Sequence, residues 1–111
     1  MTVWTRADMT DQSGKVFIVT GANSGVGYQT ALGLAQKNAT VVMACRDVDR
    51  SRSAFEAVQA ASSPDLVHLM TLDLASLQSI EAFTAEFKQA FDQLDGLINN
   101  AGPVGAALLI S

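Results

Sequence analysis

With 111 residues the chain has room for a single domain, and 49% hydrophobic against 16% charged residues argues against a disordered protein. The formal net charge of −4 disfavours nucleic acid and anionic membrane surfaces as partners, since both attract basic patches. No run of about 18 apolar residues and no signal peptide is visible, so we expect no membrane span and a cytoplasmic protein.

Residues 1–14 are polar and aperiodic, so we expect an N-terminal arm before a domain that takes residues 15–111. Four short apolar runs follow, which are typical of parallel strands buried on both faces. These predicted strands are residues 15–19 (KVFIV), 40–44 (TVVMA), 66–72 (LVHLMTL) and 94–100 (LDGLINN).

Helices are predicted between the strands, over residues 25–37, 47–61 and 76–92, from apolar residues three or four apart. Asn38 is expected to end the first helix in left-handed geometry, and Ser76 to cap the start of the third. The predicted inward positions are Val26, Thr30, Ala31, Leu34 and Ala35, then Ala54, Val58 and Ala61, then Leu77, Ile80, Phe83, Phe87 and Phe91.

This alternation predicts an α/β protein, a doubly wound parallel sheet with helices on both faces. The chain has one cysteine, Cys45, and one histidine, His68, so neither a disulfide within the chain nor a cysteine-based metal site is expected. Both residues fall in strand-like runs. We therefore expect them to be core residues and not a catalytic pair.

Three glycines, Gly21, Gly25 and Gly27, follow the first predicted strand directly. At such a junction glycine permits a tight turn and a close backbone approach to a pyrophosphate, while the N–H groups of the following helix face the anion. A P-loop is disfavoured because no Gly-Lys-Ser/Thr sequence follows. The pattern therefore favours a dinucleotide site.

Three motifs in order, TGANSGVG (20–27), LDLAS (72–76) and NNAG (99–102), resemble the short-chain dehydrogenase/reductase family over about residues 14–102. VVMACRD and LDLASLQSI are most similar to its retinol-dehydrogenase-like and protochlorophyllide-reductase-like branches. The resemblance implies a Rossmann-like sheet, here truncated after about four strands. It also implies an oxidoreductase that moves a hydride between a nicotinamide and a carbonyl, an alcohol or a reducible double bond.

The resemblance also assigns cofactor contacts. In the glycine loop, Asn23 and Ser24 would reach the adenosine side, Asp73 and Leu74 would lie beside the adenine, and the NNAG motif would line the cofactor. For Asp73 a helix-entry role stays open, and Asn100 could chiefly tie strands together. The full expected set is Gly21, Asn23, Ser24, Gly25, Val26, Gly27, Arg46, Asp73, Leu74, Asn100, Ala101 and Gly102.

The end of the second strand favours NADP over NAD. Cys45 stands where the family's acidic residue would bind the ribose 2′-hydroxyl, and Arg46 follows with a guanidinium suited to a 2′-phosphate. The Asp47 carboxylate argues for NAD instead, unless it caps the following helix or points away from the cofactor. Arg46 could also be an ordinary surface charge.

The family's catalytic Tyr-x-x-x-Lys is absent, because Tyr28 is the sole tyrosine and Leu32 follows it by four positions. We expect no catalytic residue in this chain, and a small-molecule substrate only if a C-terminal half accompanies it. Two alternatives are a non-catalytic dinucleotide-binding module and an inactive truncated product. An uncovered fourth strand would favour self-association.

Overall fold

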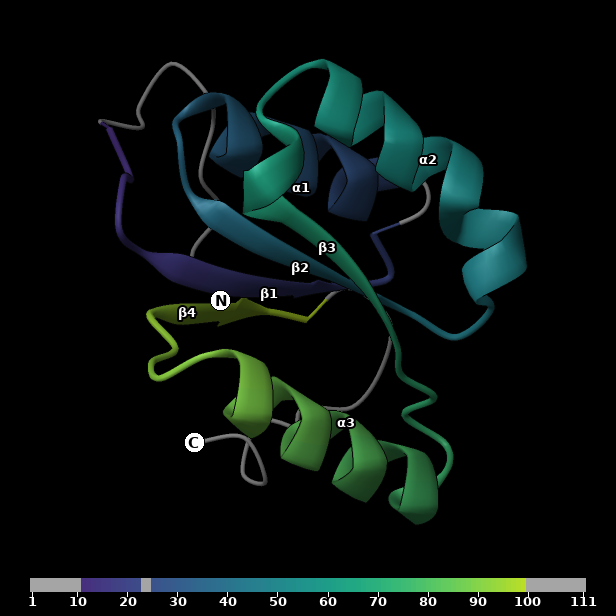
Figure 1. Ribbon diagram of the computed structural model, residues 1–111. Coiled ribbons are helices and arrows are strands. Elements are labelled where there is room, and N and C mark those ends of the chain that lie inside the picture. Colours follow the sequence, from purple (N-terminus) through teal and green to yellow (C-terminus); the bar gives the residue numbers. More distant parts are fainter. Residues whose placement is uncertain (1–10, 23–24, 100–111) are drawn as a thin grey trace.

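The computed structural model describes residues 11–22 and 25–99 (Figure 1). Strands and helices alternate through this part as predicted, with one additional 3₁₀ helix, η2. In chain order the elements are β1 (Val16–Thr20), α1 (Gly25–Gln36), β2 (Thr40–Cys45), α2 (Val48–Ala60), η2 (Pro64–Leu66), β3 (Val67–Thr71), α3 (Leu77–Ala90) and β4 (Gly96–Ile98).

The four described strands form one parallel sheet in the order β3-β2-β1-β4. Val16 pairs with Thr40 and Ile18 pairs with Leu97, so β1 lies in the middle between β2 and β4. The chain moves outward from β1 to β3 and then crosses back to the other side of β1. This reversal makes β1 and β4 neighbours in the sheet.

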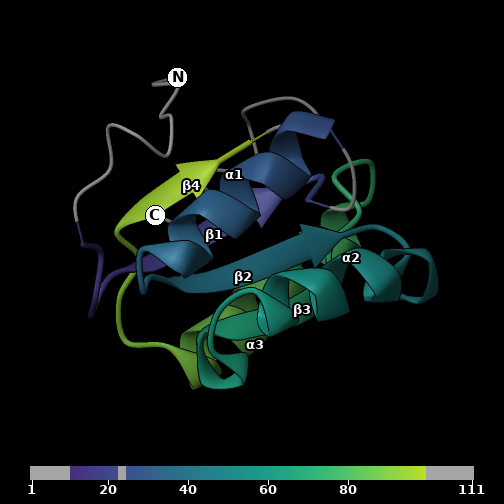
Figure 2. The same cartoon turned by 90° about the horizontal axis from the view of Figure 1, so that it is seen from above.

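Helices cover both faces of the sheet, which confirms the doubly wound, Rossmann-like fold. In Figure 1, α1 and α2 lie on one face and α3 lies on the other; the view in Figure 2 is turned by 90°. Side chains alternate along each strand with a period of two, so one sheet supplies two cores. Cys45 faces α1 and α2, whereas Val42 and Ala44 face α3.

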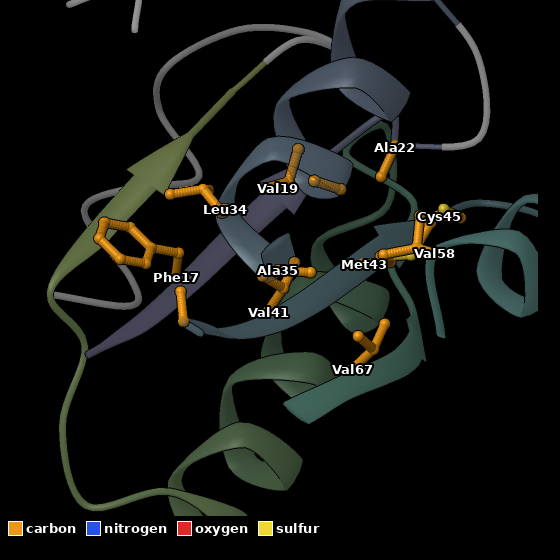
Figure 3. Packing of buried hydrophobic residues seen from close by; sticks show 12 residues of the cluster. Phe17, Val19, Ala22, Leu34, Ala35, Val41, Met43, Cys45, Val58 and Val67 are labelled. Atoms are coloured by element: carbon orange, nitrogen blue, oxygen red, sulfur yellow. The ribbon is translucent and has the colours of Figure 1, made fainter. Parts of the chain in front are cut away.

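The larger core fills the space between the sheet and the α1–α2 layer (Figure 3). Leu34 and Val58 are fully buried there, the first from α1 and the second from α2. The opposite core contains three buried side chains of α3, Ile80, Phe83 and Phe87. Phe83 and Phe87 stack with ring centroids 6.2 Å apart. These residues confirm the helical faces that the periodicity predicts.

Both predicted helix boundaries are confirmed. Asn38 takes a φ of 72° after α1, and the Ser76 side chain accepts a hydrogen bond of 3.2 Å from the Ser79 N–H at the start of α3. Three predicted inward positions are wrong. Val26 and Leu77 are 65% and 64% exposed because each lies in the first turn of its helix, and Ala61 is exposed at the end of α2.

The fourth strand is shorter than predicted, with residues 96–98 in place of 94–100 within the described chain. Before it, the Asp95 carboxylate accepts a hydrogen bond from the Val16 N–H at 2.7 Å, and the Asp95 N–H donates to the Val16 carbonyl at 2.8 Å. Gln93 donates to the same carboxylate and to the Gly14 carbonyl. These contacts attach β4 to β1, and in the described chain the other edge of β4 is unpaired.

Part of the predicted N-terminal arm is attached to the domain. The Gln12 N–H donates to the Lys37 carbonyl at 2.7 Å, and the Asn38 side chain donates to Asp11 at 2.8 Å. Residues 11–14 therefore contact the turn between α1 and β2. In the described part of the chain, no helix is long and apolar enough to cross a membrane.

Asp95 predicts how stability depends on pH. Hydrogen bonds from the Val16 N–H and Gln93 lower the pKa of Asp95 below its ordinary value of 3.8. Because the folded chain favours the ionised form, this contribution is full above pH 3.8 and is lost as the pH falls through the lower folded pKa. We expect Asp95→Asn to lower the urea midpoint above pH 5, with a difference from wild type that shrinks below pH 4.

The control is Asp92→Asn, an exposed carboxylate three residues earlier. Its urea midpoint should follow that of the wild type at each pH. A difference between Asp95→Asn and wild type that stays constant down to pH 2 would contradict this assignment.

Candidate functional site

The carboxyl edge of the sheet brings together the ends of strands that are distant in sequence. In a doubly wound sheet the ligand crevice lies at this edge, where the strand order reverses. Here the reversal falls between β1 and β4, whose central residues Ile18 and Leu97 pair. The three sequence motifs with cofactor assignments begin at or directly after the ends of β1, β3 and β4 at this edge, apart from residues outside the described chain.

The turn from β1 to α1 depends on glycine. Gly21 and Gly25 have φ values of 59° and 60°, a left-handed conformation that other residues rarely adopt. The α-carbon of Gly27 lies against the turn itself, and a Cβ there would overlap the Gly21 carbonyl oxygen. Gly25, by contrast, has open space where its Cβ would be. Gly21 and Gly25 therefore present backbone without a Cβ on either side of the undescribed residues 23 and 24, next to the N-terminus of a 12-residue helix.

Side chains at the ends of β1 and β4 fix this turn relative to the sheet. The Thr20 hydroxyl donates a hydrogen bond of 2.9 Å to the Asn99 side-chain oxygen, and the Gly21 N–H donates to the Ala44 carbonyl at 3.1 Å. The first asparagine of the NNAG motif thus ties the strands together. The sequence interpretation left that role open for Asn100, which lies outside the described residues.

A cleft of about 530 Å³ opens at this edge, between the first turn of α2 and the segment after β3. Residues from four segments form it. They are Thr20, Gly21, Ala44, Arg46, Asp47, Arg50, Leu72, Asp73, Leu74 and Ala75. The cleft joins the β1–α1 turn to a set of charged side chains, so one extended polar ligand could contact both.

Two arginines line one side of the cleft, and both are exposed. Arg46 follows β2 directly, and Arg50 lies in the first turn of α2. No salt bridge occupies either guanidinium within residues 11–22 and 25–99. The Asp47 carboxylate accepts a hydrogen bond of 3.1 Å from the Arg50 N–H, which confirms its predicted capping of α2.

Asp73 and Leu74 lie on the other side of the cleft, after β3. The Asp73 carboxylate accepts a hydrogen bond of 2.9 Å from the Ala75 N–H, and the Asp73 N–H donates to the Ser79 hydroxyl at 2.8 Å. Asp73 therefore does shape the entry to α3, while it also lines the cleft. Leu74 packs against the core beneath α3 and supplies an apolar surface beside the charged residues.

The structure brings most of the described candidate residues to this edge. Gly21, Arg46, Asp73 and Leu74 line the cleft itself, while Gly25, Val26 and Gly27 begin α1 next to it. Asn23, Ser24, Asn100, Ala101 and Gly102 lie outside the described residues, and their expected cofactor contacts stay predictions.

Other chemically capable residues do not form a site. Cys45 is buried on the sheet face that packs against α1 and α2. His68 pairs with Val42 in the sheet, so it lies on the opposite face, where its ring contacts Phe91 edge to face at 5.2 Å. Tyr28 packs against the core beside Leu32. Among the described residues no group of three or more His, Cys, Asp or Glu side chains could hold a metal.

Sequence reasoning missed Arg50 and Thr20. Arg50 follows Arg46 by four positions, a spacing that could have indicated a second guanidinium near the same point. The role of Thr20 depends on the pairing of β1 with β4, 78 residues later, and no local pattern carries that information.

The profile of the family described as short chain dehydrogenase matches residues 15–109 of this sequence. The chain belongs to this family. Retinol dehydrogenase 11 of Mus musculus is 49% identical over 89 residues, which are 80% of this chain and 28% of that protein. The expected similarity to retinol dehydrogenases is thereby confirmed, and the chain spans just over a quarter of that relative's length.

Two solved structures of oxidoreductases show the same fold. The menthone neomenthol reductase of Mentha piperita superposes with a TM-score of 0.75 at 38% identity, over 80% of this chain and 32% of that one. A short chain dehydrogenase of Shigella flexneri 2a in complex with NADP superposes with a TM-score of 0.78 at 19% identity, over 90% of this chain and 52% of that one. At that identity the second likeness concerns the fold alone.

The glycine turn gives a prediction about stability. We expect Gly27→Ala to lower the free energy of unfolding by about 3 kcal/mol, at the upper end of overpacking effects, because its Cβ meets backbone that cannot move aside. Gly25→Ala should cost only about 1 kcal/mol, the strain of a left-handed alanine in open space. Urea unfolding followed by circular dichroism measures both, and equal losses would contradict the packing argument.

Proposed function

We propose that this chain binds NADP(H) at the carboxyl edge of its sheet, as the coenzyme-binding part of an oxidoreductase of the short chain dehydrogenase family. The observation that carries the proposal is the cleft that connects the glycine turn after β1 with Arg46 and Arg50. NAD(H) is the less favoured coenzyme. Membership of the short chain dehydrogenase family supports a nicotinamide coenzyme, and the Shigella flexneri neighbour shows NADP bound in a protein of the same fold.

The described backbone fits a pyrophosphate at the β1–α1 turn. A bound diphosphate needs N–H donors that no side chain covers, and a helix N-terminus supplies both such donors and a favourable dipole. Gly21 and Gly25 provide the left-handed turn, and Gly27 lets α1 begin directly against it. The side-chain-free surface at this point is what a close approach by a diphosphate requires.

The residues after β2 fit a ribose 2′-phosphate. Cys45, which stands where an acidic residue would accept hydrogen bonds from a 2′-hydroxyl, is buried in the core and 2% exposed. Arg46 and Arg50 both line the cleft and present guanidinium groups, which bind phosphate oxygens in pairs. Leu74 and Asp73 would lie beside the adenine on the other side.

When bound, the nicotinamide would supply hydride transfer to or from a carbonyl, an alcohol or a reducible double bond. The described residues of this chain contribute binding and orientation. Its one tyrosine, Tyr28, packs against the core, so we assign it no proton transfer. The substrate site belongs in our proposal to a longer protein, in line with the length of the retinol dehydrogenase relative.

The preference for NADPH gives a test with both arginines. We expect Arg46→Ala and Arg50→Ala each to weaken NADPH binding about tenfold and to leave NADH binding within twofold, because NADH has no 2′-phosphate. Isothermal titration calorimetry at 50 mM and 200 mM salt measures these dissociation constants. The NADPH affinity of the wild type should also fall more steeply with salt than that of either variant.

The control is Arg52→Ala, an exposed arginine of α2 that does not line the cleft. It should bind both coenzymes as the wild type does. No heat with either coenzyme from folded wild-type chain would overturn the proposed function, and equal loss of NADPH and NADH affinity in the arginine variants would overturn the assignment of the 2′-phosphate.

A further inference from the structure

We infer that Asp47 is a positioning residue for coenzyme selection: it holds the first turn of α2 so that Arg50 extends over the cleft. The inference rests on the proposed function, which assigns Arg46 and Arg50 to the 2′-phosphate. The negative charge of an acidic residue at this place would be expected to repel a phosphate. The structure shows instead that its carboxylate is bonded to the helix.

Asp47 makes three hydrogen bonds with the first turn of α2. Its carboxylate accepts from the Arg50 N–H at 3.1 Å, and its carbonyl accepts from both the Ser51 N–H at 3.1 Å and the Ser51 hydroxyl at 2.7 Å. Ser51 is 1% exposed, so its two hydrogen bonds connect Asp47 to a buried residue of α2. Asp47 itself has extended backbone, with φ −118° and ψ 102°.

The bonds determine where Arg50 lies. The Asp47 carboxylate accepts a hydrogen bond from the backbone N–H of Arg50. The residues that flank the Asp47–Arg50 segment are also held in place, because Arg46 follows β2 directly and Ser51 is buried. Without the cap, the first turn of a helix loses one of its few side-chain partners and frays. Arg50 would then leave its place in the cleft lining more often.

The same carboxylate carries a negative charge at the cleft, which has the opposite effect on a phosphate. Removing the charge alone should tighten NADPH binding, whereas removing the cap alone should weaken it. Asparagine caps a helix as well as aspartate does and has no charge, while alanine also has no charge but cannot cap. Comparing Asp47→Asn with Asp47→Ala therefore isolates the cap at constant charge.

The experiment measures NADPH and NADH dissociation constants of the 111-residue chain by calorimetry. We expect Asp47→Ala to bind NADPH about fivefold more weakly than Asp47→Asn, with NADH affinities of the two variants equal within error. Asp47→Asn should bind NADPH at least as tightly as the wild type. Equal NADPH affinities for the alanine and asparagine variants, or a parallel loss for NADH, would overturn the inference.

Further variants keep the test specific. In an Arg50→Ala background the difference between Asp47→Ala and Asp47→Asn should vanish, because Asp47 acts through Arg50. Asp49 lies in the same first turn without lining the cleft, so Asp49→Ala and Asp49→Asn should bind NADPH equally. If Asp47→Ala is unfolded by circular dichroism, Ser51→Ala removes the hydroxyl bond to the Asp47 carbonyl, keeps the backbone bond, and should lower NADPH affinity selectively. Unchanged NADPH affinity would overturn the inference.

The two levels of the proposal fail in different ways. Arg50→Ala could lose its preference for NADPH over NADH while Asp47→Ala and Asp47→Asn bind NADPH equally. That result leaves the proposed function standing and removes only the positioning role of Asp47. Absence of any NADPH binding by folded wild-type chain removes both.

Discussion

The contact on which the site depends is that between the α-carbon of Gly27 and the carbonyl of Gly21. It sets α1 directly against the end of β1, closer than any side chain would allow. Two left-handed glycines make the turn that permits this approach. The helix N-terminus and the Gly21 backbone consequently lie together at the carboxyl edge, which is the arrangement an anion requires.

The sheet order then decides what surrounds that point. Because β1 is central, its carboxyl end has β2 on one side and β4 on the other. Thr20 bonds Asn99 on the β4 side, and Gly21 bonds the Ala44 carbonyl on the β2 side. The turn is thus tied to both neighbours, and the charged residues that follow β2 lie within the same cleft. Membership of the short chain dehydrogenase family agrees with this arrangement.

The sequence predicted the elements well where burial is two-sided. The strands β1 and β2 are apolar except for one threonine each, and α3 repeats phenylalanine at helical spacing, so these elements have no plausible alternative. The helix positions that were wrongly predicted to be buried lie near helix ends, where apolar periodicity and burial no longer coincide. Val26 and Leu77 continue the apolar faces of their helices, yet each lies in a first turn and its side chain is mostly exposed. Periodicity shows which face of a helix is apolar, but it does not show which turns of that face are buried.

The site was predictable to the extent that backbone chemistry determines it. Glycine spacing after a strand identified the turn, and Cys45 followed by Arg46 identified the end of β2. Arg50 and the Thr20–Asn99 bond depend on how α2 begins and on which strands pair. Such information resides in tertiary structure, so it emerged only from the fold.

The most direct measurement of the central claim is a backbone amide chemical-shift titration of the isotope-labelled chain with NADP⁺. The account predicts saturable shifts at Gly21 and Gly27 of the β1–α1 turn and at Arg46 and Leu74 beside the cleft, with little change at the opposite sheet edge around Gln12 and Asp95. A folded chain that shows no shifts at saturating NADP⁺, or shifts concentrated at that opposite edge, would contradict it.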